Sequence, residues 1–167
     1  MDHLNVAQQV AFAAIALAMV VSALRVVTTT NVVHAALYLV VVLAGVGMQF
    51  LLLGAEYTAV TQVIVYIGAI VVLFLFGIFL TRAPIGSTSG LDNDKRWAAV
   101  IVALFLFGLL AYALRDFFGS TRIDFAGPQT SAQVGDSMFQ TYVIPFEVVS
   151  VLLLAALIGA IVIARRD

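Results

Sequence analysis

Residues 55–80, AEYTAVTQVIVYIGAIVVLFLFGIFL, decide the fold class of this chain. The stretch contains one charged residue, Glu56, and beyond Gly68 it is almost wholly apolar. A transmembrane α-helix needs about 20 mainly apolar residues, each of which adds a rise of about 1.5 Å. Residues 55–80 therefore predict a helix that crosses a membrane.

Four more stretches meet the same criterion, namely residues 6–24, 32–53, 97–114 and 141–164. The segments between them carry turn chemistry: residues 84–95 read PIGSTSGLDNDK, which is typical of a solvated loop. Residues 115–140 have no long apolar run and predict an extramembrane connector with room for a short surface helix. We expect an all-α, polytopic membrane protein of one domain, residues 1–167, with five transmembrane helices.

The composition supports a membrane environment. Of 167 residues, 63% are hydrophobic and 10% charged, whereas soluble globular chains are about 45–50% apolar and about 25% charged. A domain of this size cannot hide so much apolar surface inside itself, so the excess must face lipid. The first basic residue is Arg25, so the N-terminus lacks the basic region of a secretory signal, and residues 6–24 predict a retained span.

Charge and cysteine usage narrow the function. The net charge is −1 and there is no basic block, so we expect no nucleic-acid partner. The absence of cysteine excludes disulfides, thiolate nucleophiles and iron–sulfur ligation by this chain. His3 and His34 are the two histidines and lie far apart in the sequence, so a metal or haem site is not expected. No nucleotide-binding motif is present.

Orientation follows from the distribution of basic residues over alternate loops. One side receives two of the eight, Arg115 and Arg122. The other side receives six: Arg25, Arg82, Lys95, Arg96, Arg165 and Arg166. This asymmetry predicts a cytoplasmic C-terminus and, for an odd number of spans, an N-terminus outside.

Polar residues inside the spans are candidates for function because they are costly in lipid. Glu56 begins the third helix, where either the helix dipole or a place in a proton path explains it. Glu147 follows the start of the fifth helix at Thr141 by six residues, about 9 Å along the axis. Its carboxylate either hydrogen-bonds a neighbouring subunit or belongs to a polar path, and Ser150 shares its face.

The third helix carries the clearest polar pattern. Thr58, Gln62 and Tyr66 are spaced by four residues, which predicts one slowly drifting polar stripe on a regular α-helix. Such a stripe either holds water or joins helices by hydrogen bonds. On the second helix, Asn31, His34 and Tyr38 form a smaller group, in which a packing role for the lone histidine is the commoner explanation.

The residues of these helices resemble a known family. The stretch GAEYTAVTQVIVYIGAIVVLFLF is the most specific part, supported by LRVVTTTNVVHAALYLVVV before it and YVIPFEVVSVLLLAALIGAIVIARRD at the end. All three are similar to NADH-quinone oxidoreductase subunit J of bacterial respiratory complex I, the counterpart of mitochondrial NADH dehydrogenase subunit 6. Some relatives carry an acidic residue where Gln62 stands, so no carboxylate relay is assigned there.

The resemblance implies a π-bulge in the third helix at Tyr66-Ile67-Gly68. In the family, rotation at this bulge is associated with opening or closing a water path between the quinone region and the antiporter-like subunits. A π-bulge adds one residue to a turn, and its removal rotates one side of the helix by about 100° relative to the other. Glu56, Thr58, Gln62 and Glu147 are the accompanying candidates for a polar path.

We therefore expect a non-catalytic subunit of a proton-pumping NADH:quinone oxidoreductase in the bacterial inner (plasma) membrane. NADH, FMN, iron–sulfur clusters and quinone are expected on partner subunits, with none bound by this chain. The expected partners are the small K-type and A-type subunits, the quinone-binding H-type subunit, the antiporter-like subunits and lipid. Two alternatives stay open: a subunit of a multisubunit cation/proton antiporter, and a purely structural membrane subunit.

Overall fold

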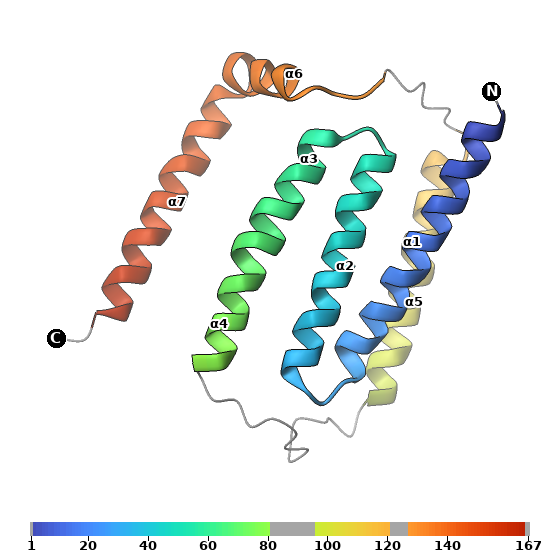
Figure 1. Ribbon diagram of the computed structural model, residues 1–167, viewed down its shortest axis with the longest axis horizontal. Coiled ribbons are helices and arrows are strands. Elements are labelled where there is room, and N and C mark those ends of the chain that lie inside the picture. Colours follow the sequence, from blue (N-terminus) through green and yellow to red (C-terminus); the bar gives the residue numbers. More distant parts are fainter. Residues whose placement is uncertain (1, 81–95, 121–126, 166–167) are drawn as a thin grey trace.

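The computed structural model describes residues 2–80, 96–120 and 127–165, and helices make up nearly all of them (Figure 1). Three elements, α3, η1 and α4, follow one another without a break and form a single span, in which η1 is wound as a π-helix. The short π-helical turn η2 leads into the last span. The elements in chain order are α1 (Asp2–Thr28), α2 (Val32–Leu52), α3 (Glu56–Thr61), η1 (Gln62–Val71), α4 (Val72–Leu80), α5 (Arg96–Phe118), α6 (Ser131–Asp136), η2 (Ser137–Thr141) and α7 (Val143–Ala164).

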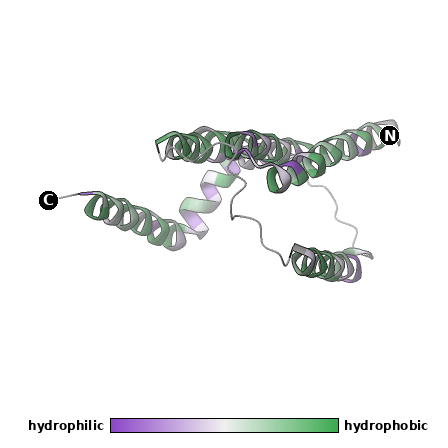
Figure 2. Cartoon of the chain, turned by 90° about the horizontal axis from the view of Figure 1, so that it is seen from below, coloured by the Kyte–Doolittle hydropathy of each residue, from purple (hydrophilic) through white to green (hydrophobic). Residues whose placement is uncertain are grey.

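Five helices are long and apolar enough to cross a membrane, which confirms the predicted fold class. In Figure 2 these helices are green along most of their length, whereas the α6 segment is paler and partly purple. The first span extends to Thr28, beyond the predicted end at residue 24, and the Thr28 hydroxyl there donates to Leu24 O at 2.8 Å. The last span begins at Val143, two residues later than predicted, because η2 occupies residues 137–141.

The packed core lies on both sides of α2, between α1 on one side and the α3–η1–α4 span on the other (Figure 1). Several of the residues buried there are small: Ala36 and Gly47 of α2 and Ala59 of α3 are among them. Without a hydrophobic driving force between helices in lipid, small residues stabilise helix pairs because they let the backbones approach closely. The sequence of α2 thus sets its place at the centre.

A glycine makes the tight turn between α2 and α3. Gly54 has φ +71°, a conformation that suits glycine. Its N–H donates to Leu51 O at 3.0 Å, and Ala55 N–H donates to Phe50 O at 2.9 Å. These two bonds are the Schellman arrangement that satisfies the last carbonyls of a helix. In addition, Gln129 N–H donates to Gly54 O at 3.2 Å, which attaches the connector to this turn.

Asn31 is the N-cap of α2. Its side-chain oxygen accepts hydrogen bonds from Val33 N at 3.0 Å and His34 N at 3.3 Å, so it satisfies two N–H groups that have no partner within the helix. The side chain of His34 is exposed. Of the predicted group of Asn31, His34 and Tyr38, helix capping therefore explains Asn31.

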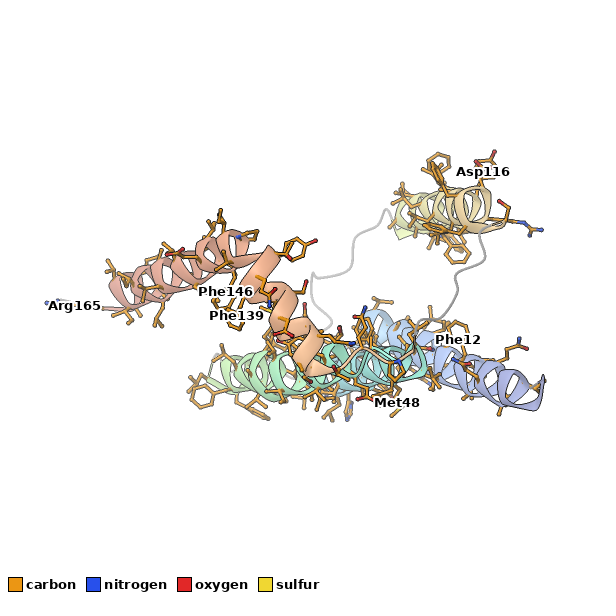
Figure 3. All side chains as sticks on the ribbon, turned by 90° about the horizontal axis from the view of Figure 1, so that it is seen from above. Phe12, Met48, Asp116, Phe139, Phe146 and Arg165 are labelled. Atoms are coloured by element: carbon orange, nitrogen blue, oxygen red, sulfur yellow. The ribbon has the colours of Figure 1, made fainter. Side chains whose placement is uncertain are left out.

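Two spans stand apart from the core. Within the described residues, α5 contacts no other element and α7 contacts only η2. The overlap of α5 with α1 in Figure 1 is an effect of the view, since Figure 3 shows α5 well separated from the other helices. The predicted loop at residues 84–95 and part of the connector lie outside the described residues. The described part of the connector contains α6, which a Thr130–Gln133 capping box begins.

Candidate functional site

The middle of the third span is a π-helix of 10 residues, Gln62–Val71. Tyr66, Ile67 and Gly68, to which the resemblance assigned a π-bulge, lie at its centre. π-helical segments are rare and usually a single turn long, and they are frequent at functional sites. The winding is present in the structure, and the gating role of these three residues stays a prediction.

The burial pattern shows what the π-helix does to the face that meets α2. Gln62 and Val71, its first and last residues, are buried, with 6% and 3% of their surface exposed. Between them Ile67 is half-buried, whereas its neighbours Tyr66 and Gly68 are exposed. The inward positions are therefore separated by five residues from 62 to 67 and by four from 67 to 71.

A regular α-helix would not bury both ends of this segment on one side. Nine residues separate Gln62 from Val71, and at about 100° per residue they would point in directions about 180° apart. The single five-residue step removes this angular difference. It adds one residue to a turn, so every later residue of the helix takes the direction that the residue before it would have had. The π winding is thus what allows Gln62 and Val71 to face α2 together.

The predicted stripe of Thr58, Gln62 and Tyr66 does not form a single face, and that prediction was wrong in detail. Gln62 is buried against α2, but Thr58 is exposed and Tyr66 is 47% exposed. In the turn before Gln62 the inward position is taken by Ala59, so Thr58 lies beside the buried face. After Gln62 the π winding interrupts the four-residue repeat that the prediction assumed, and Tyr66 turns outward. Thr58 and Tyr66 are available to lipid or a partner chain.

Gln62 is a link between helices. Its side-chain amide donates to Leu43 O of α2, at 3.4 Å. A bond of this length lies beyond the usual 2.7–3.2 Å and is weak. Gln49 makes a similar contact on the opposite side of α2, where its Nε2 donates to Phe12 O of α1 at 3.4 Å. Amide side chains thus connect α2 to the helix on either side of it.

We expect Gln62→Leu to leave assembly and quinone reductase turnover close to wild type. The net contribution of a neutral hydrogen bond is about 0.5–1.5 kcal/mol, and Leu restores apolar contact at the same position. The measurements are the yield of assembled complex and its turnover in membranes, with Thr58→Val as the exposed control. Lost turnover in an assembled Gln62→Leu complex would instead place Gln62 on a proton path.

The two glutamates of the predicted polar path lie on separate helices. Glu56 is the first residue of α3 and is exposed, a position that the positive end of the helix dipole favours. Glu147 follows Val143, the first residue of α7, by four positions and is exposed as well. No hydrogen bond or ion pair joins either carboxylate to the described part of the chain, so the structure does not bring them together with Gln62.

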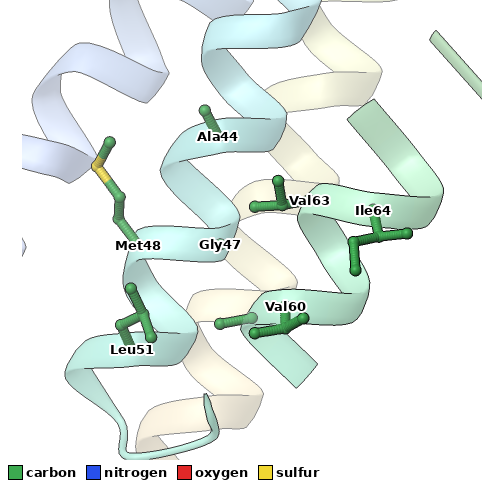
Figure 4. A pocket seen from close by; sticks show the side chains of 8 residues that line it. Ala44, Gly47, Met48, Leu51, Val60, Val63 and Ile64 are labelled. Carbon is green, nitrogen blue, oxygen red and sulfur yellow. The ribbon is translucent and has the colours of Figure 1, made fainter. Parts of the chain in front are cut away.

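A groove lies between α2 and the third span, and the sequence did not predict it (Figure 4). Its volume is about 330 Å³, and apolar residues of α2, α3 and η1 line it: Ala44, Gly47, Met48, Leu51, Ala59, Val60, Val63 and Ile64. Gly47 forms part of its floor, and a Cβ built there would lie 3.6 Å from Gln62 Cγ. In the sequence, the small residues Ala44 and Gly47 on one helix were the feature that could have indicated this groove.

Fold and site define the class: a polytopic α-helical membrane protein with a π-helix in its central span and two spans that pack on no other span in the described chain. The family model of NADH-ubiquinone/plastoquinone oxidoreductase chain 6 matches residues 22–163. This chain belongs to that family.

Relatives match over nearly the whole length. The chain is 34% identical to NAD(P)H-quinone oxidoreductase subunit 6 of the Paulinella chromatophora chromatophore, with 98% of this chain and 80% of the relative covered. It is 35% identical to chain 6 of NAD(P)H-quinone oxidoreductase of Synechocystis sp., with 96% and 82% covered. F(420)H(2) dehydrogenase subunit J of Methanosarcina mazei is 37% identical, with 93% and 90% covered.

Membership confirms several predictions. The chain is a multi-pass membrane-arm subunit of the proton-translocating NADH-quinone oxidoreductase family, a non-catalytic part of an enzyme complex, and the other subunits of such a complex are its partners. The match favours the oxidoreductase over the cation/proton antiporter as the complex to which the chain belongs.

Proposed function

We propose that the η1 segment of the third span couples quinone reduction to proton translocation by changing its winding. The observation that carries the proposal is the single five-residue step between Gln62 and Ile67 on the side facing α2. A packed interface accepts discrete arrangements more readily than continuous deformation. The step defines one arrangement, and its removal defines a second.

Rewinding η1 as a regular α-helix would exchange the residues that face α2. Counting by four from Gln62, Tyr66 and Ile70 would move inward in place of Ile67 and Val71. Tyr66 would bring its hydroxyl from an exposed position to the boundary with α2, next to the apolar groove. At that boundary the Tyr66 hydroxyl could bind water in the regular winding, whereas in the π winding it points away from α2. This difference in hydration is the gate that we propose.

The same proposal covers the finer points of assembly. We place this subunit beside the small K-type and A-type subunits, the quinone-binding H-type subunit and the antiporter-like subunits. NADH, FMN, iron–sulfur clusters and quinone are assigned to those partners and to the rest of the complex, and the absence of cysteine in this chain supports this for the clusters. We place the chain in a bacterial plasma membrane with its C-terminus in the cytoplasm, which the unequal distribution of basic residues supports.

The names of the relatives bear on where in the complex this subunit acts. Two are subunits of NAD(P)H-quinone oxidoreductases and one belongs to an F(420)H(2) dehydrogenase. The electron donors in these names differ, although the identity to this chain is similar throughout. We infer that the subunit acts on the quinone side of electron transfer and is indifferent to the donor.

Gly68 provides a test of the winding change. A Cβ at Gly68 would meet only Val63 O, at 3.5 Å, which is ordinary contact. We therefore expect Gly68→Ala to assemble normally. Gly68→Val adds a β-branched side chain, which loses rotamer freedom against the preceding helical turn, and we expect it to slow quinone reductase turnover severalfold in an assembled complex.

A purely structural subunit predicts a different result for Gly68→Ala and Gly68→Val. If the span only fills space, both Gly68 variants should retain turnover and proton stoichiometry together with assembly. Turnover and proton uptake in proteoliposomes, normalised to assembled complex, separate the two. Full coupling in Gly68→Val would contradict the gate.

A further inference from the structure

Glu147 is an ionisable residue inside a span, and it has no hydrogen-bond or ion-pair partner in the part of the chain that the structure describes. The span Val143–Ala164 contains 22 residues, which corresponds to about 33 Å at about 1.5 Å per residue, close to the hydrocarbon thickness of about 30 Å. Glu147 lies four residues, or about 6 Å, from the start of this span. Its position is therefore within the apolar layer near one edge, where a carboxylate that faces lipid is unfavourable.

Nothing in the described chain compensates this cost. Glu147 makes no hydrogen bond or ion pair there, and α7 packs on no other span. The nearest polar side chain on its face, Ser150, uses its hydroxyl to donate to Phe146 O of the same helix at 2.9 Å. The carboxylate oxygens of Glu147 thus accept no hydrogen bond from a side chain of their own helix.

The start of α7 is held in place, which makes the carboxylate a fixed feature. The rings of Phe139 in η2 and Phe146 in α7 are arranged edge to face, with centroids 5.1 Å apart (Figure 3). Such aromatic pairs stabilise a structure beyond the burial of their surfaces. Upstream, the connector is bound to the α2–α3 turn through Gln129 and Gly54. Glu147 follows Phe146 directly and is presented by an anchored helix.

We propose that the Glu147 face of α7 is an interface for a transmembrane helix of another subunit that carries a basic side chain at the depth of Glu147. Charge complementarity selects this occupant over lipid, because a carboxyl group in the apolar layer is stabilised by a cationic hydrogen-bond donor and acyl chains offer none. The proposal rests on membership of a multisubunit complex and is independent of the winding change in η1.

The decisive comparison is Glu147→Leu against Val149→Leu, a control of about the same depth on the opposite side of α7. If Glu147 faced lipid, Leu would be the better residue, since it favours the membrane interior. If it binds a basic group, Leu leaves that group buried and unpaired. We expect Glu147→Leu to raise the dissociation of this subunit from the complex in mild detergent about tenfold, equivalent to about 1.4 kcal/mol.

Two further results complete the test. Glu147→Gln still offers an accepting oxygen, so its dissociation should rise less than that of Glu147→Leu. In the wild-type complex, a photo-reactive amino acid at Val151, one turn along the same face, should cross-link to another subunit on a peptide with Lys, Arg or His. Unchanged retention of Glu147→Leu, adducts with lipid alone, or a peptide without a basic residue would overturn the proposal. Because the main readout is subunit retention, a failed gate in η1 would not affect it.

Discussion

Deletion of Ile67 should abolish coupled proton translocation and still allow the complex to assemble. The deletion removes the extra residue between Gln62 and Val71, so a regular α-helix can then bring both to the side of α2. The packing of α2 against the third span would be kept, and the second winding would be lost. We expect proton uptake to fall at least tenfold relative to wild type.

The measurement is proton uptake and quinone reductase turnover in proteoliposomes that contain assembled complex. Deletion of Phe79, near the end of α4, is the matched control, because it shortens the span equally and leaves η1 unchanged. Circular dichroism cannot distinguish the variants, but the pattern of hydrogen exchange across residues 62–71 can. Normal pumping after deletion of Ile67 would show that the winding of this segment has no part in coupling.

Gly45→Val should destabilise the pair of α1 and α2 and reduce the amount of assembled subunit. A Cβ at Gly45 would lie 2.7 Å from Met19 Sδ and closer still to Met19 Cγ, far inside normal contact distance. Overpacking of this kind costs about 1–3 kcal/mol, since side chains or helices must shift. Small residues let α1 and α2 approach closely, so a shift of either helix weakens their association.

Met19 supplies the rescue. The double variant Met19→Ala, Gly45→Val removes the clashing side chain and should recover most of the assembled subunit, as measured by its yield in the solubilised complex. Gly77→Val serves as a control, because a Cβ at Gly77 would meet nothing within 4 Å. Equal losses for Gly45→Val and Gly77→Val would mean that the contact with Met19 does not hold the helices together.

Much of the fold follows from the sequence because long apolar runs have few solutions in lipid. Backbone groups must be satisfied inside each segment there, so a run such as residues 55–80 becomes a helix whatever its neighbours do. The turn at Gly54 was equally predictable, since only a residue tolerant of positive φ closes it so tightly. The resemblance at Tyr66-Ile67-Gly68 also pointed to the region where the π winding is found.

What the tertiary structure alone decided is which side of each helix faces another. The sequence places Thr58, Gln62 and Tyr66 on one stripe, but burial against α2 separates Gln62 from the other two. Ala59 takes the inward position before Gln62, and the change of winding after it turns Tyr66 outward. The apolar groove and the close approach of Gly45 to the Met19 side chain also arise only when helices meet. Composition determines that this chain is a membrane protein, whereas contacts between helices determine which residues stay exposed and can contact partner subunits.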